Sequence, residues 1–497
     1  MGRKTNYETS LYNEFEKLNK KLDKANNTIS VMSLTIYNLN LDIKNYQEEI
    51  NKNKELIKKL IEENERLKNK NNKNSTNSSK PSSTNMTTPK KKTGANLYNY
   101  RIKTNNRVGG QLGHNGYSLN KDAVEKIIKT NNIKVIEIKH KIKGNSKKEK
   151  IVKYKLGVNI KPYIEKHIFV CDENSNEILP KEFYTDVTYT NDIKALSIEL
   201  GAHNLISYDR LSDFFSVITN NIINISNGTL VNFLQEFSSK SKLTIKNLEN
   251  NILNSKTNFT DETTAKFNKK NLYVRNYSNE ETVIYKVHKN KGHAPILEDN
   301  ILPRFCGGIM GDHDTTLYSY GTNRYECNIH IGRYLEELIQ NIKVISWPFK
   351  MKELIFRMHN TRKIAIQYEV KKFDKNKIKE YEKEYDNILE LAKQENKEIK
   401  SIYYKDKSDK LYRRLKKYKN NHLYFIKDFD VPFDNNLSER DLRCFKNKTK
   451  ISGGFRTING ATSYVNTLTI IKTSIKRKIN PFDSIKAIFN NKTLFAN

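Results

Sequence analysis

Residues 431–455 read VPFDNNLSERDLRCFKNKTKISGGF and set one carboxylate, Glu439, among basic and amide side chains. Asp434 is placed to cap a helix at the start of this stretch. One face of that helix carries, at spacings of three and four, Asn436, Glu439, Arg440 and Arg443. A Glu beside an Arg is usually a solvated pair on a helix surface. The stretch therefore predicts chemistry only together with acids elsewhere in the chain.

The overall charge of the chain predicts a polyanionic partner. Its 497 residues include 89 Lys and Arg against 56 Asp and Glu, which gives a formal net charge of +33. Nucleic acid fits this surplus better than a membrane does, because no apolar run has the length of a spanning helix. The first ten residues lack the apolar core of a signal peptide, so we expect a cytoplasmic protein. The four cysteines are Cys171, Cys306, Cys327 and Cys444. They are too widely spaced for a disulfide scaffold or a CxxC metal site.

A heptad pattern over residues 8–68 predicts a coiled coil, and therefore a homo-oligomer. Steps of four and three residues connect Leu11, Phe15, Leu18, Leu22, Ala25, Ile29, Met32, Ile36, Leu39, Ile43, Tyr46, Ile50, Asn53, Ile57, Leu60, Asn64 and Leu67. With Phe15 at an a position, Asn64 also falls at a, where a buried Asn favours parallel dimers in one register. The alternative is an antiparallel hairpin with another helix of the same chain, because the repeat fits either arrangement.

Three segments follow before the central domain. Residues 69–106 are rich in Ser, Thr, Asn and Lys, which predicts a flexible basic linker. Residues 107–187 begin with a Gly-rich basic loop and continue with alternation typical of strands between Ile133 and Val170, which predicts a small β unit. Residues 188–245 contain three helical patterns, the last one with Ser226 as its cap. They are either a helix-turn-helix that binds DNA or a plain helical bundle that supports the next domain.

The central domain is expected to be an α/β core formed by residues 255–345 and 430–460. Asp261 precedes a predicted β-hairpin, and Asp312 follows a short apolar strand. His330 and Arg333 lie on neighbouring turns of the helix that comes next. Residues 346–429 are charged with helical periodicity and are interpreted as an all-helical insertion. Residues 461–497 form a C-terminal helical segment.

Carboxylates at the ends of regular elements in a basic protein suggest a two-metal phosphoryl-transfer site. Mg²⁺ prefers hard oxygen ligands, and two ions about 3.5 to 4 Å apart can activate the attacking oxygen and stabilise the leaving one. The candidate ligands are Asp261, Asp312 and Glu439. The candidate contacts to the DNA backbone are Arg440, Arg443, Lys446, Lys448, Lys450 and Arg456. The glycines of Ser452–Phe455 predict a turn that brings backbone close to DNA.

Several motifs together resemble the DDE transposases of the insertion sequence 66 family over most of the chain. They are, in order, the N-terminal zipper, NSSKPSS (77–83), GGQLGHNG (109–116), DET (261–263), GDHDTTLY (311–318), the spaced Cys327, His330 and Arg333, and PFDNNLSERDLRCFKNKTKISGGFRTINGA (432–461). The last motif is long and specific, so it carries most of the resemblance.

The resemblance implies an RNase H-like fold in which Asp261, Asp312 and Glu439 bind two Mg²⁺ or Mn²⁺ ions. Asp314 is a rival for the second position. His330 and Arg333 are implied as helpers, although a structural polar helix end explains them as well. Relatives usually carry a cysteine-rich zinc finger after the GGQ motif, whereas this stretch holds only Cys171, so we expect the β scaffold without zinc.

The sequence thus predicts a nucleoid-associated bacterial transposase. It would bind the terminal inverted repeats of its element, nick the ends by water attack and join the freed 3′ hydroxyl to target DNA. Two alternatives remain open. One is a non-catalytic coiled-coil protein that binds DNA, in which the three carboxylates would lie far apart. The other is an RNase H-like nuclease that cleaves without joining.

Overall fold

The computed structural model describes residues 6–74, 77–78, 121–130, 135–138, 152–156, 160–169, 183, 185–267 and 270–495. The chain divides into two compact units, each described by itself. The first, the helical unit, comprises residues 1–92, 330–361 and 374–419. The second, the sheet unit, comprises residues 93–329, 362–373 and 420–497.

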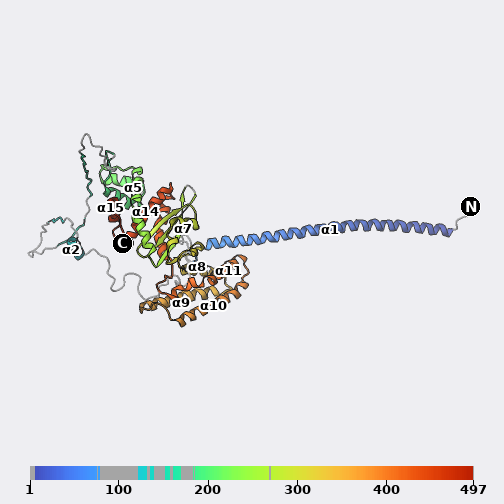
Figure 1. The fold of residues 1–497 in the computed structure, drawn as a ribbon. Helices are drawn as coiled ribbons and strands as arrows, with labels where there is room; N and C mark the ends of the chain where they lie inside the picture. Colours follow the sequence, from blue (N-terminus) through green and yellow to red (C-terminus); the bar gives the residue numbers. More distant parts are fainter. Residues whose placement is uncertain are drawn as a thin grey trace, which may run out of the picture. The chain divides into compact units, whose positions relative to one another are not determined.

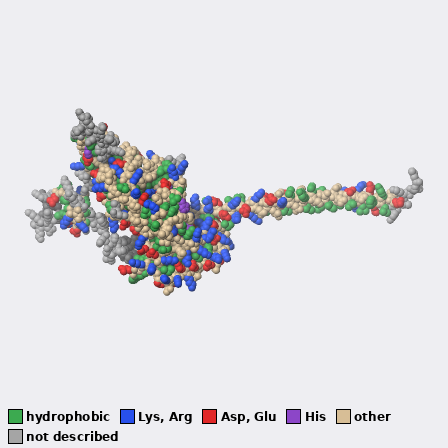
Figure 2. All heavy atoms as spheres, viewed as in Figure 1, with side chains coloured by type: hydrophobic (Ala, Val, Ile, Leu, Met, Phe, Trp, Pro, Cys, Tyr) green, Lys and Arg blue, Asp and Glu red, His purple; other side chains and the backbone are tan. Residues whose placement is uncertain are grey.

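The helical unit begins with α1 (Asn6–Asn72), an uninterrupted helix of 67 residues (Figure 1). Its apolar seam is exposed, from Leu11 at 54% to Leu60 at 59%. Figure 2 shows these hydrophobic side chains along the helix surface. The helix is therefore confirmed over the heptad stretch, and its apolar seam is not covered by the described part of the chain. Pairing with a second copy stays a prediction.

The rest of the helical unit packs around its own buried polar contacts. Its helices include α9 (Trp347–Gln367), α10 (Lys375–Glu395), η6 (Asn396–Glu398) and α11 (Ile402–Lys417), preceded by α8 (Asn328–Asn341), and the ends of α8 and α9 extend into the sheet unit. Asn396 accepts hydrogen bonds from Trp347 Nε1 at 3.0 Å and Ser408 Oγ at 2.7 Å. Ser401 Oγ donates to Glu65 Oε2 at 2.5 Å, which ties the end of α1 to the start of α11.

The sheet unit is built on a five-stranded mixed sheet of order β3-β2-β1-β4-β5. Its strands are β1 (Thr257–Phe267), β2 (Lys270–Ser278), β3 (Val283–His288), β4 (Gly308–Gly311) and β5 (Asn323–Glu326). β1, β2 and β3 pair antiparallel, whereas β1, β4 and β5 run parallel. The predicted hairpin is confirmed as β2–β3. Its turn is held by Asn279, whose side chain accepts from the backbone N–H groups of Glu281 and Thr282.

The helices of this unit that follow α2 pack against the sheet or against one another. They are α3 (Asn191–Ile198), η3 (Glu199–His203), α4 (Tyr208–Ile218), α5 (Asn227–Lys240), α6 (Lys242–Leu253), α7 (His293–Asp299), η4 (Leu302–Arg304), η5 (Thr315–Ser319), α12 (Lys419–Lys427), α13 (Asn436–Ser452), α14 (Ile458–Lys476) and α15 (Pro481–Phe489). α14 docks on β3, where Thr469 and Thr473 hydroxyls accept from the backbone N–H groups of Tyr285 and Val283, each at 3.2 Å. The result is an α/β core, as the sequence predicts.

The helices predicted within residues 188–245 form, and Ser226 caps α5 by accepting from Thr229 N at 3.1 Å. The apolar face of α5 is buried on two sides. Leu230 and Phe233 pack with α4, and Phe237 packs with Phe489 of α15 at 5.4 Å between ring centroids. This packing is that of a supporting bundle, and a DNA contact from this region stays a prediction.

Part of the predicted N-terminal organisation lies outside the described residues. This holds for most of the linker, for the whole GGQ loop and for Cys171. Described pieces of the predicted β unit, residues 135–138, 152–156 and 160–169, contain no strand. The short helix α2 (Lys121–Thr130) follows the GGQ loop in sequence and was not predicted.

Candidate active site

The register of two parallel strands places Asp261 beside Asp312. In the β1–β4 pair, Phe259 lies opposite Met310. Two residues further along each chain come Asp261, inside β1, and Asp312, directly after β4. Because parallel neighbours advance together, the two carboxylates reach the same end of the sheet. Residues some fifty positions apart in the sequence thus become neighbours.

Buried asparagines attach the start of α13 to this strand end. The backbone N–H of Asp261 donates to Asn276 Oδ1 at 3.0 Å, and Ser438 Oγ donates to the same oxygen at 2.7 Å. Asn276 is fully buried, so water cannot take its place as the acceptor for these two donors. One amide of β2 therefore links the backbone of Asp261 to the residue that precedes Glu439.

The segment before α13 makes a second attachment. Asn435 is fully buried and its Nδ2 donates to the carbonyl of Thr260 at 2.9 Å, while its backbone N–H donates to Cys327 Sγ at 3.3 Å. Asp434 accepts from Asn436 N at 2.9 Å, but the N-cap of α13 is Asn435, so the predicted cap lies one residue before the helix N-cap. These contacts fix the helix origin against β1, and Glu439 follows one turn later.

The electrostatics of Asp261 reflect this convergence. Burial, and after it the Asp312 carboxylate, raise the pKa of Asp261 to about 6. Glu439 contributes to the same increase, whereas the N–H of Glu262 and the ammonium of Lys446 act against it. All three predicted ligands are thus close enough to interact, and Lys446 is near them. An excess of like charge in a partly buried site is what a bound cation would relieve.

The rival acid Asp314 is engaged differently. Its Oδ1 accepts from Thr316 N at 3.1 Å and Thr316 Oγ1 at 2.6 Å, and Arg275 Nη2 donates to its Oδ2 at 3.3 Å. Burial acts to raise the pKa of Asp314, but these hydrogen bonds and the Arg275 charge outweigh burial and lower it. The same guanidinium pairs with Glu262 at 3.0 Å. Asp314 therefore serves as the cap of η5 and as part of an ion-pair cluster.

The predicted DNA-contacting cations differ in their exposure to solvent. Arg440, Arg443, Lys450 and Arg456 are exposed, and Lys446 is half-buried. Lys448 instead lies over the rings of Tyr208 and Tyr464, at 5.9 and 5.7 Å from their centroids, and burial lowers its pKa. Lys448 is thus the member of the set that packs against aromatic rings, whereas four of the others face solvent.

His330 and Arg333 contact one another near the start of α8. Arg333 Nη1 lies 3.1 Å from Nε2 of the buried His330. This contact fits the structural explanation of the pair, and a helper role stays a prediction.

The glycine turn after α13 approaches a strand. Gly454 has a φ of +145°, and a Cβ there would lie 2.5 Å from the carbonyl oxygen of Lys266 in β1. Phe455 N donates to that oxygen at 2.9 Å. These glycines therefore permit a close backbone approach to β1. This contact anchors the C-terminal end of α13 to the strand that carries Asp261.

Two positioning residues were missed by sequence reasoning. One is Asn276, an ordinary residue within a strand pattern. The other is the buried Arg324 of β5, whose Nη2 donates to the carbonyl of Asp312 at 2.5 Å and whose Nη1 donates to that of Ile309 at 2.8 Å. A basic residue in a predicted short strand of a basic protein gives no signal for such a role.

The chain belongs to a class of DNA-mobilising proteins, the transposases. Residues 187–463, more than half of the chain, match the model described as the transposase IS66 family, and the chain belongs to that family. No curated protein matches the chain significantly. Among the described residues, no helix combines the length and the apolar character that crossing a membrane requires.

Proposed function

We propose that this transposase is a DDE enzyme that cleaves the ends of its element and joins them to target DNA. The observation that carries the proposal is the β1–β4 register, which sets Asp312 beside Asp261, together with Glu439 of α13, whose charge helps to raise the pKa of Asp261. The mixed sheet of order β3-β2-β1-β4-β5, antiparallel on one side of β1 and parallel on the other, supports an RNase H-like catalytic core.

The donor set suits divalent metal. Three carboxylates offer the hard oxygen ligands that Mg²⁺ and Mn²⁺ take, and their mutual repulsion at Asp261 favours a cation. Asp261, Asp312 and Glu439 would hold two ions, which activate the attacking oxygen and stabilise the leaving one. The chain itself orients these ligands through Asn276 and Asn435, and Lys446 places a positive charge beside them.

The surroundings of the site support DNA as the substrate. Exposed cations surround the site: Arg440, Arg443 and Lys450 lie on α13, the helix that carries Glu439, and Arg456 lies just after it. Such side chains neutralise backbone phosphates, so binding should weaken as salt concentration rises. The exposed seam of α1 supports a homo-oligomer held by a parallel coiled coil, which would bring two catalytic sites to two element ends. We expect this activity in the bacterial cytoplasm, at the nucleoid.

The test is a strand-transfer assay with the element's own ends, supercoiled target DNA and Mg²⁺, on full-length protein. Asp261→Asn, Asp312→Asn and Glu439→Gln should each abolish both cleaved and joined products while DNA binding persists. Full activity in any one variant removes that residue from the site. Cleaved ends without joined products in the wild type would instead identify a nuclease of the same fold.

A further inference from the structure

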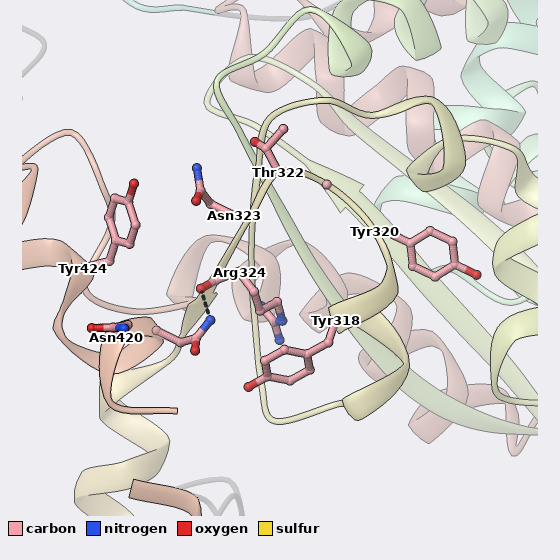
Figure 3. A pocket seen from close by; sticks show the side chains of 9 residues that line it. Tyr318, Tyr320, Thr322, Asn323, Arg324, Asn420 and Tyr424 are labelled. Atoms are coloured by element: carbon pink, nitrogen blue, oxygen red, sulfur yellow. Dashed lines mark hydrogen bonds between the residues drawn. The ribbon is translucent and has the colours of Figure 1, made fainter. Parts of the chain in front are cut away.

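A polar and aromatic pocket lies at the β5 edge of the sheet unit. It has a volume of about 290 Å³ and is lined by Tyr318, Tyr320, Gly321, Thr322, Asn323, Arg324, Asn420, Asn421 and Tyr424. Figure 3 shows Tyr424 and Asn420 from the α12 side of this space and Thr322 and Asn323 from the opposite segment. This volume lies just below the roughly 300–1,000 Å³ of drug-sized ligand sites, so it suits a small planar group.

One buried side chain connects this pocket to the catalytic carboxylates. Arg324 lines the pocket, and the same guanidinium donates to the backbone carbonyl of Asp312 at 2.5 Å. Asn421 Nδ2 donates to the carbonyl of Arg324 at 2.7 Å, which fixes α12 against β5. A group in the pocket is therefore one side chain away from the backbone of Asp312, a proposed metal ligand.

The lining groups match a nucleobase better than an ion. Among the described residues, the lining contains no carboxylate that could hold a cation, and Arg324 donates from both Nη groups to backbone carbonyls. What remains are tyrosine rings and amide or hydroxyl side chains. Aromatic rings stack on bases, and amides pair with the donors and acceptors of base edges.

The aromatic wall of the pocket is held in place. The ring of Tyr424 packs on that of the buried Tyr325, with centroids 5.1 Å apart and planes tilted by 56°. Tyr320 points away from Tyr424 and Asn420 (Figure 3), and its hydroxyl lies 3.1 Å from His293 Nδ1. Rings fixed in this way lose little freedom when a planar ligand stacks on them.

We propose that this pocket binds an unpaired nucleobase of the DNA substrate, next to the scissile phosphate. A base within a duplex is covered on both faces by its neighbours, so a base that enters the pocket must be extruded or come from a single-stranded end. The inference rests on the proposed function for the identity of the substrate. It adds a base-binding step that the three carboxylates do not supply.

The experiment compares two labelled oligonucleotides that carry the same phosphates. One is a single-stranded dT 12-mer, and the other is a 12-mer of abasic nucleotides. Fluorescence anisotropy with full-length protein in Mg²⁺-free buffer gives both affinities. Because stacking and edge contacts need the base, the wild type should bind the dT 12-mer about ten-fold more tightly. Equal affinities in the wild type would overturn the proposal.

Variants then localise the preference. Tyr424→Ala and Asn420→Ala should each lower the base-dependent ratio at least about three-fold and leave the abasic affinity unchanged. Tyr424→Phe should retain most of the ratio. The matched control is Tyr368→Ala, which removes a tyrosine that is 78% exposed and outside the pocket. Asn420 is exposed, so its variant keeps the test open if Tyr424→Ala fails to fold. Wild-type ratios in both pocket variants would show that bases bind elsewhere.

The same assay separates this inference from the proposed function. Asp261→Asn should abolish strand transfer yet keep the full base-dependent ratio, because it lies outside the pocket lining. If the wild type binds bases through the pocket but shows no cleavage or joining, the proposed catalysis fails and the pocket stands. If strand transfer persists in Tyr424→Ala with an unchanged ratio, the pocket fails and the catalysis stands.

Discussion

Two pairs of acids on the same strand ends differ sharply in their surroundings. Asp261 and Asp312 lie together near Glu439, and burial and mutual repulsion raise the pKa of Asp261 to about 6. One or two residues along, Glu262 and Asp314 share the guanidinium of Arg275, at 3.0 and 3.3 Å. In the first pair, burial and the neighbouring carboxylates disfavour the charged form of Asp261, whereas in the second pair both carboxylates form ion pairs with one buried guanidinium. Since side chains alternate along a strand, one step in sequence turns Glu262 to the face of β1 opposite Asp261, whereas Asp312 and Asp314 are separated by the turn that follows β4.

The largest expected effect is on stability, and it comes from removing the ion pairs that Arg275 forms with Glu262 and Asp314. Arg275→Ala should lower the free energy of unfolding by about 3 kcal/mol, because it leaves the charges of Glu262 and Asp314 partly buried without their shared partner. Urea unfolding followed by circular dichroism measures this change. The control is Lys291→Ala, which removes an exposed partner of the same Glu262 and should cost less than about 1 kcal/mol. Equal losses in the two variants would contradict the assigned role of Arg275.

The second prediction compares the strand-transfer activity of variants at Asp312 and Asp314. Asp312→Asn should reduce strand transfer at least about a hundred-fold, which corresponds to about 2.7 kcal/mol, because it removes a proposed metal ligand. Asp314→Asn should stay within about five-fold of the wild type, since that side chain caps η5 and pairs with Arg275. Initial rates of joined product at saturating Mg²⁺ distinguish the two. A reversed order would make Asp314 the second catalytic carboxylate.

The third prediction concerns the amide that connects Asp261 to α13. Asn276→Ala should cost about 2 kcal/mol of stability, because the N–H of Asp261 and the hydroxyl of Ser438 lose a buried acceptor. Strand transfer should fall as well, since Glu439 loses part of its anchor. Asn271→Ala, at an exposed position of the same strand, should change stability by less than about 0.5 kcal/mol. An Asn276 variant with wild-type stability and activity would show that the other attachments of α13 suffice.

The smallest expected effect is stabilisation by metal. At ten times its dissociation constant, Mg²⁺ should stabilise the wild type by about 1.4 kcal/mol, because it binds the folded cluster and relieves its repulsion. Thermal unfolding with and without MgCl₂, at matched ionic strength, measures the change. Asp261→Asn should lose the stabilisation, whereas Arg275→Ala should keep it. A stabilisation that survives Asp261→Asn would place the metal elsewhere.

Local regularities explain what could be predicted from the sequence. The seam of α1, the β2–β3 hairpin and the Ser226 cap depend on periodicity or on neighbours within a few residues, and each is found as predicted. Asp434 likewise bonds the first turn of α13, because its partner Asn436 lies two residues away, although the N-cap itself is Asn435. The family was evident from one long motif, and the match over residues 187–463 confirms it.

Long-range contacts explain which features could not be predicted from the sequence. Asn276 and Arg324 position the proposed ligands through hydrogen bonds to residues that are distant in sequence, so no local pattern marks them. The pocket at β5 likewise joins residues 318–324 to α12 across about a hundred residues of intervening chain. The glycine turn was expected to approach DNA, and its close backbone contact is with Lys266 of β1.

By itself the sequence determined a basic chain with a long amphipathic helix, an α/β core and three candidate carboxylates, because charge and periodicity are local properties. Only the tertiary structure decided which acids lie together and which are neutralised. Asp312 and Asp314 are two residues apart and equally acidic as isolated side chains. Strand pairing sets Asp312 beside Asp261, and the reach of one guanidinium ties Asp314 to Glu262, so their roles depend on neighbours that only folding supplies.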